Sequence, residues 1–312
     1  MYQSHFGLRE SPFGITPNPA FFYSGNTRGE LLAALLYAVC HGEGIIKVSG
    51  EVGAGKTMLC RMLERQLPPH VEVIYLVNPN LDPAGVHYAI AAELGLPTRG
   101  YRLDEVQRGL HAHLIGLHGQ GRQVVLLVEE AQAMPLETLE AIRLLTNLET
   151  AHSKLLQIVL FGQPELDQHL ELASMRQLRE RITHSFTVPP LAPQLVAEFL
   201  AFRLAAAGHD GSAVFSKAAV QLISDASQGI VRRINILADK ALLAAFADDA
   251  ATVSAEHARL AIREAPFRTA TTAAQRLASR LSGFRISTVA IVAVFAVIVA
   301  IVAGIVAALP DL

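Results

Sequence analysis

The chain has little charge and little cysteine for its length. Charged residues make up 17% of its 312 positions and the net charge is −2, which argues against a long disordered tail and against a strongly basic protein that wraps nucleic acid. Cys40 and Cys60 are too few for a disulfide framework and suit a reducing compartment. The N-terminal residues lack a charged region followed by an apolar run, so we expect no cleavable signal peptide.

A long apolar run lies near the C-terminus. Residues 286–309 hold 24 positions without charge or proline, and a helix of that length spans about 36 Å, enough to cross a hydrocarbon core of about 30 Å. The basic linker before it, residues 266–285, carries no acid and four arginines, which are Arg268, Arg276, Arg280 and Arg285. By the positive-inside rule we expect one transmembrane helix, with residues 1–265 in the cytoplasm.

The first 188 residues alternate between apolar runs and segments with helical periodicity. This alternation predicts an α/β fold with a parallel sheet covered on both faces. The expected strands are Ile45–Ser49, Val71–Val77, Val124–Val128, Leu155–Phe161 and Thr183–Val188. The expected helices between them include Met58–Leu67, Pro83–Leu94, Leu103–Leu117 and Pro135–Thr150.

After residue 188 the pattern is helical only. Helices are expected near 193–207, 216–227, 231–247 and 254–264, with Ser216 and Ser254 at N-cap positions. The predicted organisation is therefore an N-terminal segment with a leading helix (1–44), an α/β domain (45–188), a helical domain (189–265), the basic linker (266–285) and the transmembrane helix (286–309).

The most specific motif is GEVGAGKT, residues 50–57, between an expected strand and an expected helix. Its glycines let backbone N–H groups surround a phosphate, Lys56 reaches the β and γ phosphates, and Thr57 ligates Mg²⁺. This Walker A motif predicts a site for ATP and Mg²⁺. The predicted nucleotide-binding residues are Gly50, Glu51, Val52, Gly53, Ala54, Gly55, Lys56, Thr57 and Met58.

The segment QVVLLVEEAQ, residues 123–132, fits a Walker B strand. Glu129 would then hold Mg²⁺ through water, and Glu130 would polarise the attacking water. The first acid of this motif is usually Asp, and one extra methylene shifts a carboxylate by roughly 1.5 Å. The magnesium geometry and the hydrolysis rate therefore stay open, and two solvated acids at a strand end are the alternative.

Five further side chains are candidates for contacts with the phosphates. Gln163 follows a strand and could orient the water, or it could merely begin the next helix before a proline. Arg176, Arg179 and Arg181 stand where an arginine finger could reach a neighbouring subunit's nucleotide, although each could equally be a solvated helix charge. Arg232 begins a helix of the second domain and could reach a phosphate when that domain closes.

These motifs together resemble those of a known family. With EEAQAMPLETLEAIRLLTNLET, LLQIVLFGQPELD, MRQLRERI, GIVRRINILADKALL and the opening HFGLRESPFGITPNPAFFY, residues 1–265 resemble the AAA+ ATPases of the general secretion pathway protein A family. Within it they are most similar to the ATPases of mannose-sensitive haemagglutinin (MSHA) pilus biogenesis.

The resemblance implies strand order 5-1-4-3-2, a helical lid, and a homo-oligomer, either a dimer or a ring. It also implies work with type IV pilus or type II secretion assembly proteins at the bacterial inner membrane. By position in the family's motifs, Gln163 would be sensor 1, Arg181 or else Arg176 the arginine finger, and Arg232 sensor 2.

Three departures from the family pattern qualify it. Glu129 replaces the Walker B Asp, and Val231 stands where the sensor 2 motif usually has Pro. Secretion-type members continue into a peptidoglycan-binding domain, whereas this chain stops three residues after its apolar run, so we expect no direct cell-wall binding.

Two other functions remain open. One is an ATP-dependent DNA-binding regulator of the transposition type, although the expected membrane anchor and the net charge of −5 on residues 1–265 argue against nucleic-acid binding. The other is a nucleotide-gated scaffold with little turnover, which Glu129 favours.

Overall fold

Five parallel strands form the sheet on which the α/β part of the chain is built. They are β1 (Ile45–Ser49), β2 (Val71–Leu76), β3 (Gln123–Val128), β4 (Gln157–Gly162) and β5 (Ile182–Thr187). Their order across the sheet is β2-β3-β4-β1-β5, and every neighbouring pair is parallel. The expected order 5-1-4-3-2 is therefore confirmed, and the predicted strand ends differ from these by at most two residues.

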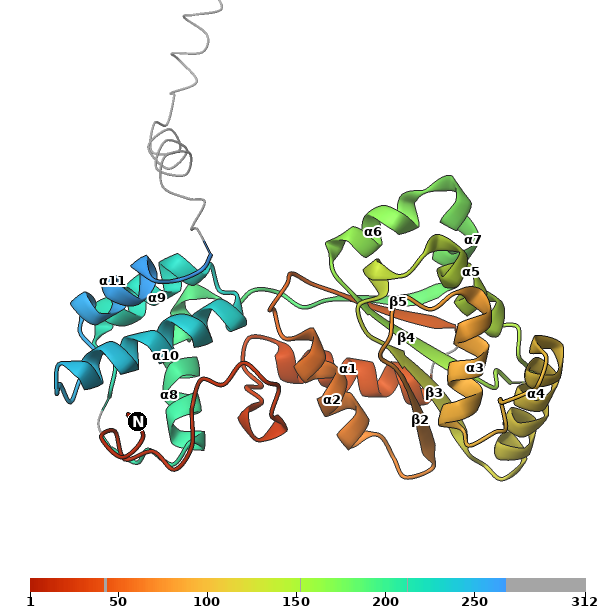
Figure 1. The fold of residues 1–312 in the computed structure, drawn as a ribbon, viewed down its shortest axis with the longest axis horizontal. Coiled ribbons are helices and arrows are strands. Elements are labelled where there is room, and N and C mark those ends of the chain that lie inside the picture. Colours follow the sequence, from red (N-terminus) through yellow and green to blue (C-terminus); the bar gives the residue numbers. More distant parts are fainter. Residues whose placement is uncertain (42–43, 152, 212, 268–312) are drawn as a thin grey trace, which may run out of the picture. The chain divides into compact units, whose positions relative to one another are not determined.

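The computed structural model describes residues 1–41, 44–151, 153–211 and 213–267, and its ribbon is shown in Figure 1. Residues 1–265 cluster as one unit. The predicted transmembrane helix, 286–309, and nearly all of the basic linker lie outside the described residues. Within the described ranges, no helix is long and apolar enough to span a bilayer.

Helices connect the strands and follow the last one. In the α/β part they are α1 (Arg28–His41), α2 (Lys56–Gln66), α3 (Pro83–Glu93), α4 (Leu103–Gly119), α5 (Leu136–Leu145), α6 (Pro164–Glu171) and α7 (Arg176–Glu180). The helical part after β5, called the lid below, consists of α8 (Val196–Ala206), α9 (Lys217–Ser227), α10 (Val231–Ala247) and α11 (Ala255–Arg263). Short 3₁₀ turns are η1 (Pro19–Phe21), η2 (Ala131–Ala133), η3 (Ala173–Met175) and η4 (Pro193–Leu195). Ser216 and Ser254 cap α9 and α11, as predicted.

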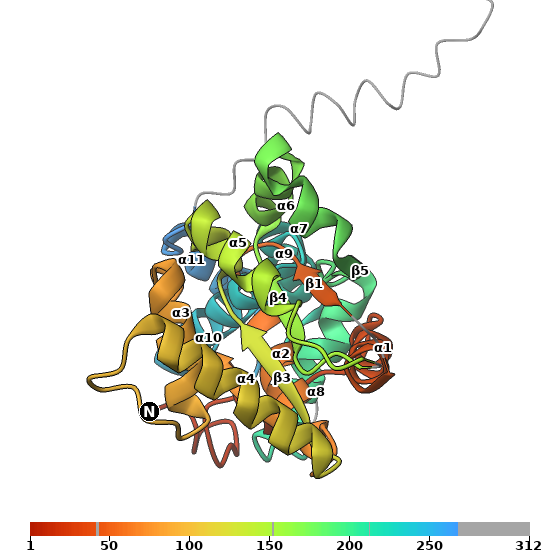
Figure 2. The same ribbon diagram turned by 90° about the vertical axis from the view of Figure 1, so that its right-hand side faces the viewer.

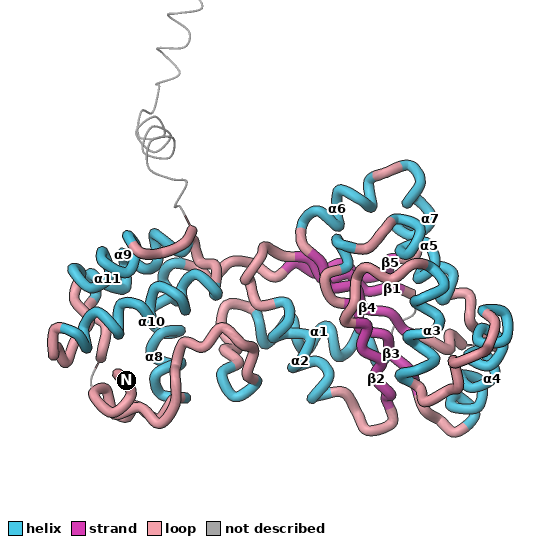
Figure 3. The backbone as a smooth tube through the Cα atoms, viewed as in Figure 1, coloured by secondary structure: helices cyan, strands magenta, loops and turns pink. Residues whose placement is uncertain are grey.

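Alternate residues of the central strands face two separate cores. On β3, Val124, Leu126 and Val128 pack with α3, α4 and α5, whereas Val125 and Leu127 pack with α1 and α2. Figure 3 shows the strands between these two groups of helices, and α3, α4 and α5 face the viewer in Figure 2. A strand buried on both faces reads as a continuous apolar run, which is why the sequence located β3 to within one residue.

The predicted helix over 135–150 is wrong in its C-terminal part. Helix α5 ends at Leu145, and the chain then makes a tight turn in which the N–H of Thr150 donates to the carbonyl oxygen of Ser153 at 2.8 Å. Glu149 and Lys154 form an isolated antiparallel bridge across this turn. Apolar residues continue at helical spacing past Leu145, but the backbone pairs at Glu149 and Lys154 instead of continuing the helix. The chain then enters β4.

The N-terminal strap, residues 1–23, packs on the lid, and the sequence did not predict this contact. Its main anchor is Arg203 of α8, which is only 5% exposed. The guanidinium donates to the carbonyl oxygens of Pro12 (2.5 Å) and Gly14 (3.2 Å) and lies 4.5 Å from the ring centre of Phe21. A buried cation therefore ties the strap to α8.

We expect Arg203→Met to lower the free energy of unfolding by about 2–4 kcal/mol, because the buried carbonyl group of Pro12 and the partly buried carbonyl group of Gly14 lose their donor. Burial lowers the pKa of Arg203 to about 10, so the group is charged at neutral pH in the native protein. Urea denaturation of residues 1–265 measures the loss. Arg259→Met is the matched control, since Arg259 pairs with Glu256 on an exposed face and should cost less than about 1 kcal/mol. Equal losses in the two variants would contradict the prediction.

Candidate functional site

Residues 50–57 form the P-loop between β1 and α2. Gly53 (φ 80°) and Gly55 (φ 108°) have a left-handed backbone, which glycine adopts without strain. Lys56 begins α2 and is only 8% exposed. Its Nζ donates to the carbonyl oxygens of Gly50 (2.6 Å) and Glu51 (3.1 Å). The loop thus curls around the ammonium group at the N-terminus of a helix, where an anion is also favoured.

Burial lowers the pKa of Lys56, while nearby carboxylates, that of Glu130 above all, act in the opposite direction. The lysine is therefore a buried cation placed close to acidic groups. Such a group has the charge and the reach to bind the outer phosphates of a nucleotide.

The first Walker B acid, Glu129, accepts two hydrogen bonds. Thr57 Oγ1 donates to its Oε2 at 2.7 Å, and the hydroxyl of Tyr75 on β2 donates to its Oε1. Thr57 and Glu129 are oxygen donors of the kind that Mg²⁺ prefers, so the pair fits a magnesium site despite the extra methylene. Tyr75 was not a sequence candidate.

The second acid, Glu130, has a strained backbone. Its φ of 53° is left-handed, which for a non-glycine residue costs about 1–3 kcal/mol and is found mainly at functional sites. Its Oε2 accepts from Gln132 Nε2 (2.7 Å) and Gln163 Nε2 (3.0 Å), and the N–H of Gln163 donates to Gln132 Oε1 (2.9 Å). These bonds hold the carboxylate at the carboxyl ends of β3 and β4.

Gln163 begins the next helix, and a contact of its side chain with water or phosphate stays a prediction. It is the N-cap residue of α6, directly before a proline, and its side chain reaches Glu130. Gln132, in η2, completes this arrangement and was missed, because nothing in the sequence pairs a residue of η2 with the end of β4.

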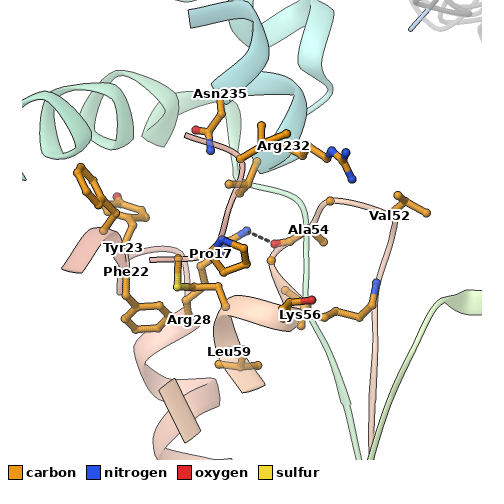
Figure 4. Close-up of a pocket in the computed structure, with 18 of the residues that line it drawn as sticks. Pro17, Phe22, Tyr23, Arg28, Val52, Ala54, Lys56, Leu59, Arg232 and Asn235 are labelled. Atoms are coloured by element: carbon orange, nitrogen blue, oxygen red, sulfur yellow. Dashed lines mark hydrogen bonds between the residues drawn. The ribbon is translucent and has the colours of Figure 1, made fainter. Parts of the chain in front are cut away.

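A cavity of about 310 Å³ opens beside the P-loop, and Figure 4 shows part of its lining. Four parts of the chain line it: the end of the strap with the start of α1, the P-loop with α2, the residues that follow β3, β4 and β5, and the lid. The predicted site residues that line it are Val52, Gly53, Ala54, Gly55, Lys56, Thr57, Met58, Glu130, Gln163 and Arg232. Gly50, Glu51 and Glu129 do not line the cavity but contact Lys56 and Thr57, which do.

The lid contacts the P-loop directly at Arg232. The N–H of Arg232 donates to the carbonyl oxygen of Gly53 at 3.0 Å, so the first turn of α10 contacts the loop. Val231 is the first residue of α10, a position where Pro is favoured because its N–H has no partner within the helix. Helix α10 begins at this position although the residue there is Val.

Two residues that line the cavity carry a buried polar atom without a partner. Arg28 Nη2 donates to the carbonyl oxygens of Ala54 (3.4 Å) and Pro189 (3.1 Å). Arg28 Nη1 and Asn235 Oδ1, however, are buried without a hydrogen-bond partner among the described residues. Each such atom costs about 1–3 kcal/mol. Both residues line the cavity, so one donor and one acceptor stand ready for a ligand.

The candidate arginine fingers lie outside this cavity. Arg181 donates to Thr146 Oγ1 (3.3 Å) and Asn147 Oδ1 (3.1 Å). Arg176 pairs with Glu180 one turn along α7, and both are well exposed. A finger acts on the nucleotide of a neighbouring subunit, so a position away from the chain's own cavity is compatible with that role, which stays a prediction for both residues.

The chain is similar in sequence to known proteins. Residues 40–170 match the family described as AAA domain. Over 248 residues, 79% of this chain, the sequence is 43% identical to "General secretion pathway protein A" of Aeromonas hydrophila. The match covers 45% of that protein, so the chain spans about half the length of this relative.

Solved structures with low sequence identity have the same fold. The ORC2 protein of Aeropyrum pernix is 18% identical with a TM-score of 0.60, covering 81% of this chain and 73% of its own. Drosophila ORC bound to DNA is 21% identical with a TM-score of 0.61, covering 84% and 65%. The RuvB branch migration motor of Thermotoga maritima is 18% identical with a TM-score of 0.52, covering 78% and 70%. At these identities the likeness concerns the fold alone.

The contact between lid and P-loop leads to a prediction for Gly53→Ala. A Cβ at this position would lie 2.6 Å from Arg232 Cβ and would require the left-handed φ of 80°. We expect a loss of about 1–3 kcal/mol in unfolding free energy. Residues 188–193 connect β5 to the lid, and we expect faster proteolysis of this segment when α10 no longer contacts the P-loop.

Gly116→Ala is the matched control for this experiment. Gly116 lies within α4, and a Cβ there would meet nothing within 4 Å. The same change should therefore stabilise the chain by about 0.5–1 kcal/mol. A stable Gly53→Ala variant with unchanged proteolysis would contradict the role given to this contact.

Proposed function

This chain belongs to the AAA ATPases related to General secretion pathway protein A, and we propose that it is a membrane-anchored AAA+ ATPase that couples ATP binding and hydrolysis to assembly of an envelope apparatus. The apparatus is a type IV pilus of the MSHA kind or a type II secretion system. One observation carries the ATPase part: a single cavity is lined by Lys56, Thr57, Glu130, Gln163 and Arg232.

Different residues that line this cavity would bind the phosphates and the base of ATP. The phosphates lie over the P-loop, where Lys56 and the N-terminus of α2 compensate their charge. Thr57 and, through water, Glu129 would hold Mg²⁺, which neutralises charge on the β and γ phosphates. Of the other residues that line the cavity, Asn235 would accept from the exocyclic amine of adenine, and Arg28 would donate to a ring nitrogen or to the ribose.

Hydrolysis is assigned to the acid held by two amides. Glu130 takes a proton from the attacking water, while Gln132 and Gln163 keep its carboxylate turned toward the phosphate end of the cavity. Gln163 and Arg232, which line the same cavity, would contact the γ phosphate. Arg181, or else Arg176, acts on the nucleotide of a neighbouring subunit, so turnover needs a homo-oligomer, either a dimer or a ring.

Anchoring is proposed from the apolar run 286–309 and the arginines before it. A single-pass helix in the bacterial inner membrane would leave the ATPase part in the cytoplasm. The similarity to a general secretion pathway protein supports a partner among the assembly proteins of a pilus or secretion system. Nucleic acid is not a proposed ligand, because residues 1–265 carry a net negative charge.

The ATPase part predicts that Glu130→Gln keeps ATP binding but lowers turnover by about 10²–10⁴-fold, because an amide cannot accept the proton of the attacking water. Binding is measured with a fluorescent ATP analogue and turnover by phosphate release. Lys56→Ala serves as the binding-deficient control. Retained turnover in Glu130→Gln would move the role of base elsewhere, and a wild-type protein that binds ATP without turnover would favour a nucleotide-gated scaffold.

The anchoring part predicts that the full chain stays in the membrane fraction after an alkaline carbonate wash, whereas residues 1–265 are released. The control is a full chain with Val297→Arg and Val299→Arg, which the wash should release. Each arginine at the centre of a span costs about 2.5–3.5 kcal/mol of insertion free energy. Release of the unaltered full chain by the wash would show that 286–309 is not an anchor.

A further inference from the structure

Tyr75 lies against the proposed magnesium site although it belongs to a strand that carries no motif. In the parallel pairing of β2 and β3, Tyr75 is opposite Leu127. Glu129 follows Leu127 by two residues, and residues two apart on a strand point to the same face. The phenol therefore extends along the sheet toward Glu129, and its hydroxyl donates to Glu129 Oε1.

The opposite side of the phenol is closed by helix α2. Cys60, one turn after Thr57, is fully buried and interacts with the Tyr75 hydroxyl. The ring of Tyr75 packs with the core formed by α1 and α2, while its hydroxyl donates to Glu129.

These contacts fix both oxygens of one carboxylate. Oε2 is turned to Thr57 at 2.7 Å, and Oε1 is held by Tyr75. A glutamate side chain has one more rotatable bond than an aspartate and so loses more rotamer freedom when it is held in one orientation. A fixed donor at Oε1 selects the rotamer that leaves Oε2 beside the P-loop threonine.

We propose that Tyr75 is a positioning residue that holds the carboxylate of Glu129 in the orientation needed to bind Mg²⁺ with the nucleotide, and so compensates for the glutamate at a position where aspartate is usual. This role rests on the proposed function, because it requires that the cavity binds a magnesium nucleotide. It explains how a longer acid can serve the site without a change in the strand.

The test is Tyr75→Phe in the full chain, which keeps the ring and removes only the hydroxyl. Binding of a fluorescent ATP analogue is titrated with Mg²⁺ and is measured separately in excess EDTA. We expect the Mg²⁺ concentration that gives half of the magnesium effect to rise about 3–20-fold, the equivalent of about 0.7–1.8 kcal/mol for one hydrogen bond to a charged group. Binding in EDTA should stay within about twofold of the wild type.

Two further variants separate positioning from packing. Tyr88→Phe removes a hydroxyl that donates to the carbonyl oxygen of Tyr101 at 3.0 Å on an exposed surface, and it should leave the Mg²⁺ titration unchanged. Adding Glu129→Asp to Tyr75→Phe should recover most of the Mg²⁺ response, because the shorter acid has less freedom to lose.

The opposite outcomes are equally clear. A Tyr75→Phe protein with a wild-type Mg²⁺ titration, or one that loses affinity equally in Mg²⁺ and in EDTA, overturns the positioning role and leaves the proposed function intact. A wild-type protein that binds no nucleotide in Mg²⁺ overturns the proposed function and this role with it.

Discussion

The buried ammonium group of Lys56 is the constraint on which the site depends. Removing a cation from water costs several kcal/mol unless other groups compensate it. Here carbonyl groups of the P-loop accept its hydrogen bonds, and they can do so only because the loop curls through the left-handed conformations of Gly53 and Gly55. The carboxylates of Glu129 and Glu130 supply the opposite charge. A phosphate can bind where this charge is already arranged.

The parallel sheet explains why the acids are near the lysine. The carboxyl ends of parallel strands meet at one edge, so the loop after β1, the acids after β3 and Gln163 after β4 converge although they are far apart in sequence. The strained backbone of Glu130 is tolerated because hydrogen bonds to two amide side chains hold its carboxylate in place. Strain and hydrogen bonding at this edge are thus parts of one arrangement.

The cavity is shared by parts of the chain that have separate anchors. The strap is fastened to the lid by Arg203, while α10 of the lid rests on the P-loop through Arg232 and Gly53. Arg28 links the P-loop to Pro189, just before the lid. A shift of the P-loop on binding or release of a phosphate would therefore change the backbone contact of Gly53 with Arg232 and the contacts of the Arg28 side chain. This is a direct physical route from the nucleotide to the helical domain.

The sequence by itself determined the strands, their alternation with helices, the P-loop and the caps at Ser216 and Ser254. Each of these depends on local properties, namely apolar periodicity, glycine freedom and side-chain capping, which are written in neighbouring residues. Only the tertiary structure decided the end of α5 at Leu145, the approach of Tyr75 to Glu129, and the unpartnered atoms of Arg28 and Asn235 at the cavity. Those features arise because strand register and packing bring together residues that are distant in sequence, and no local pattern encodes such a pairing.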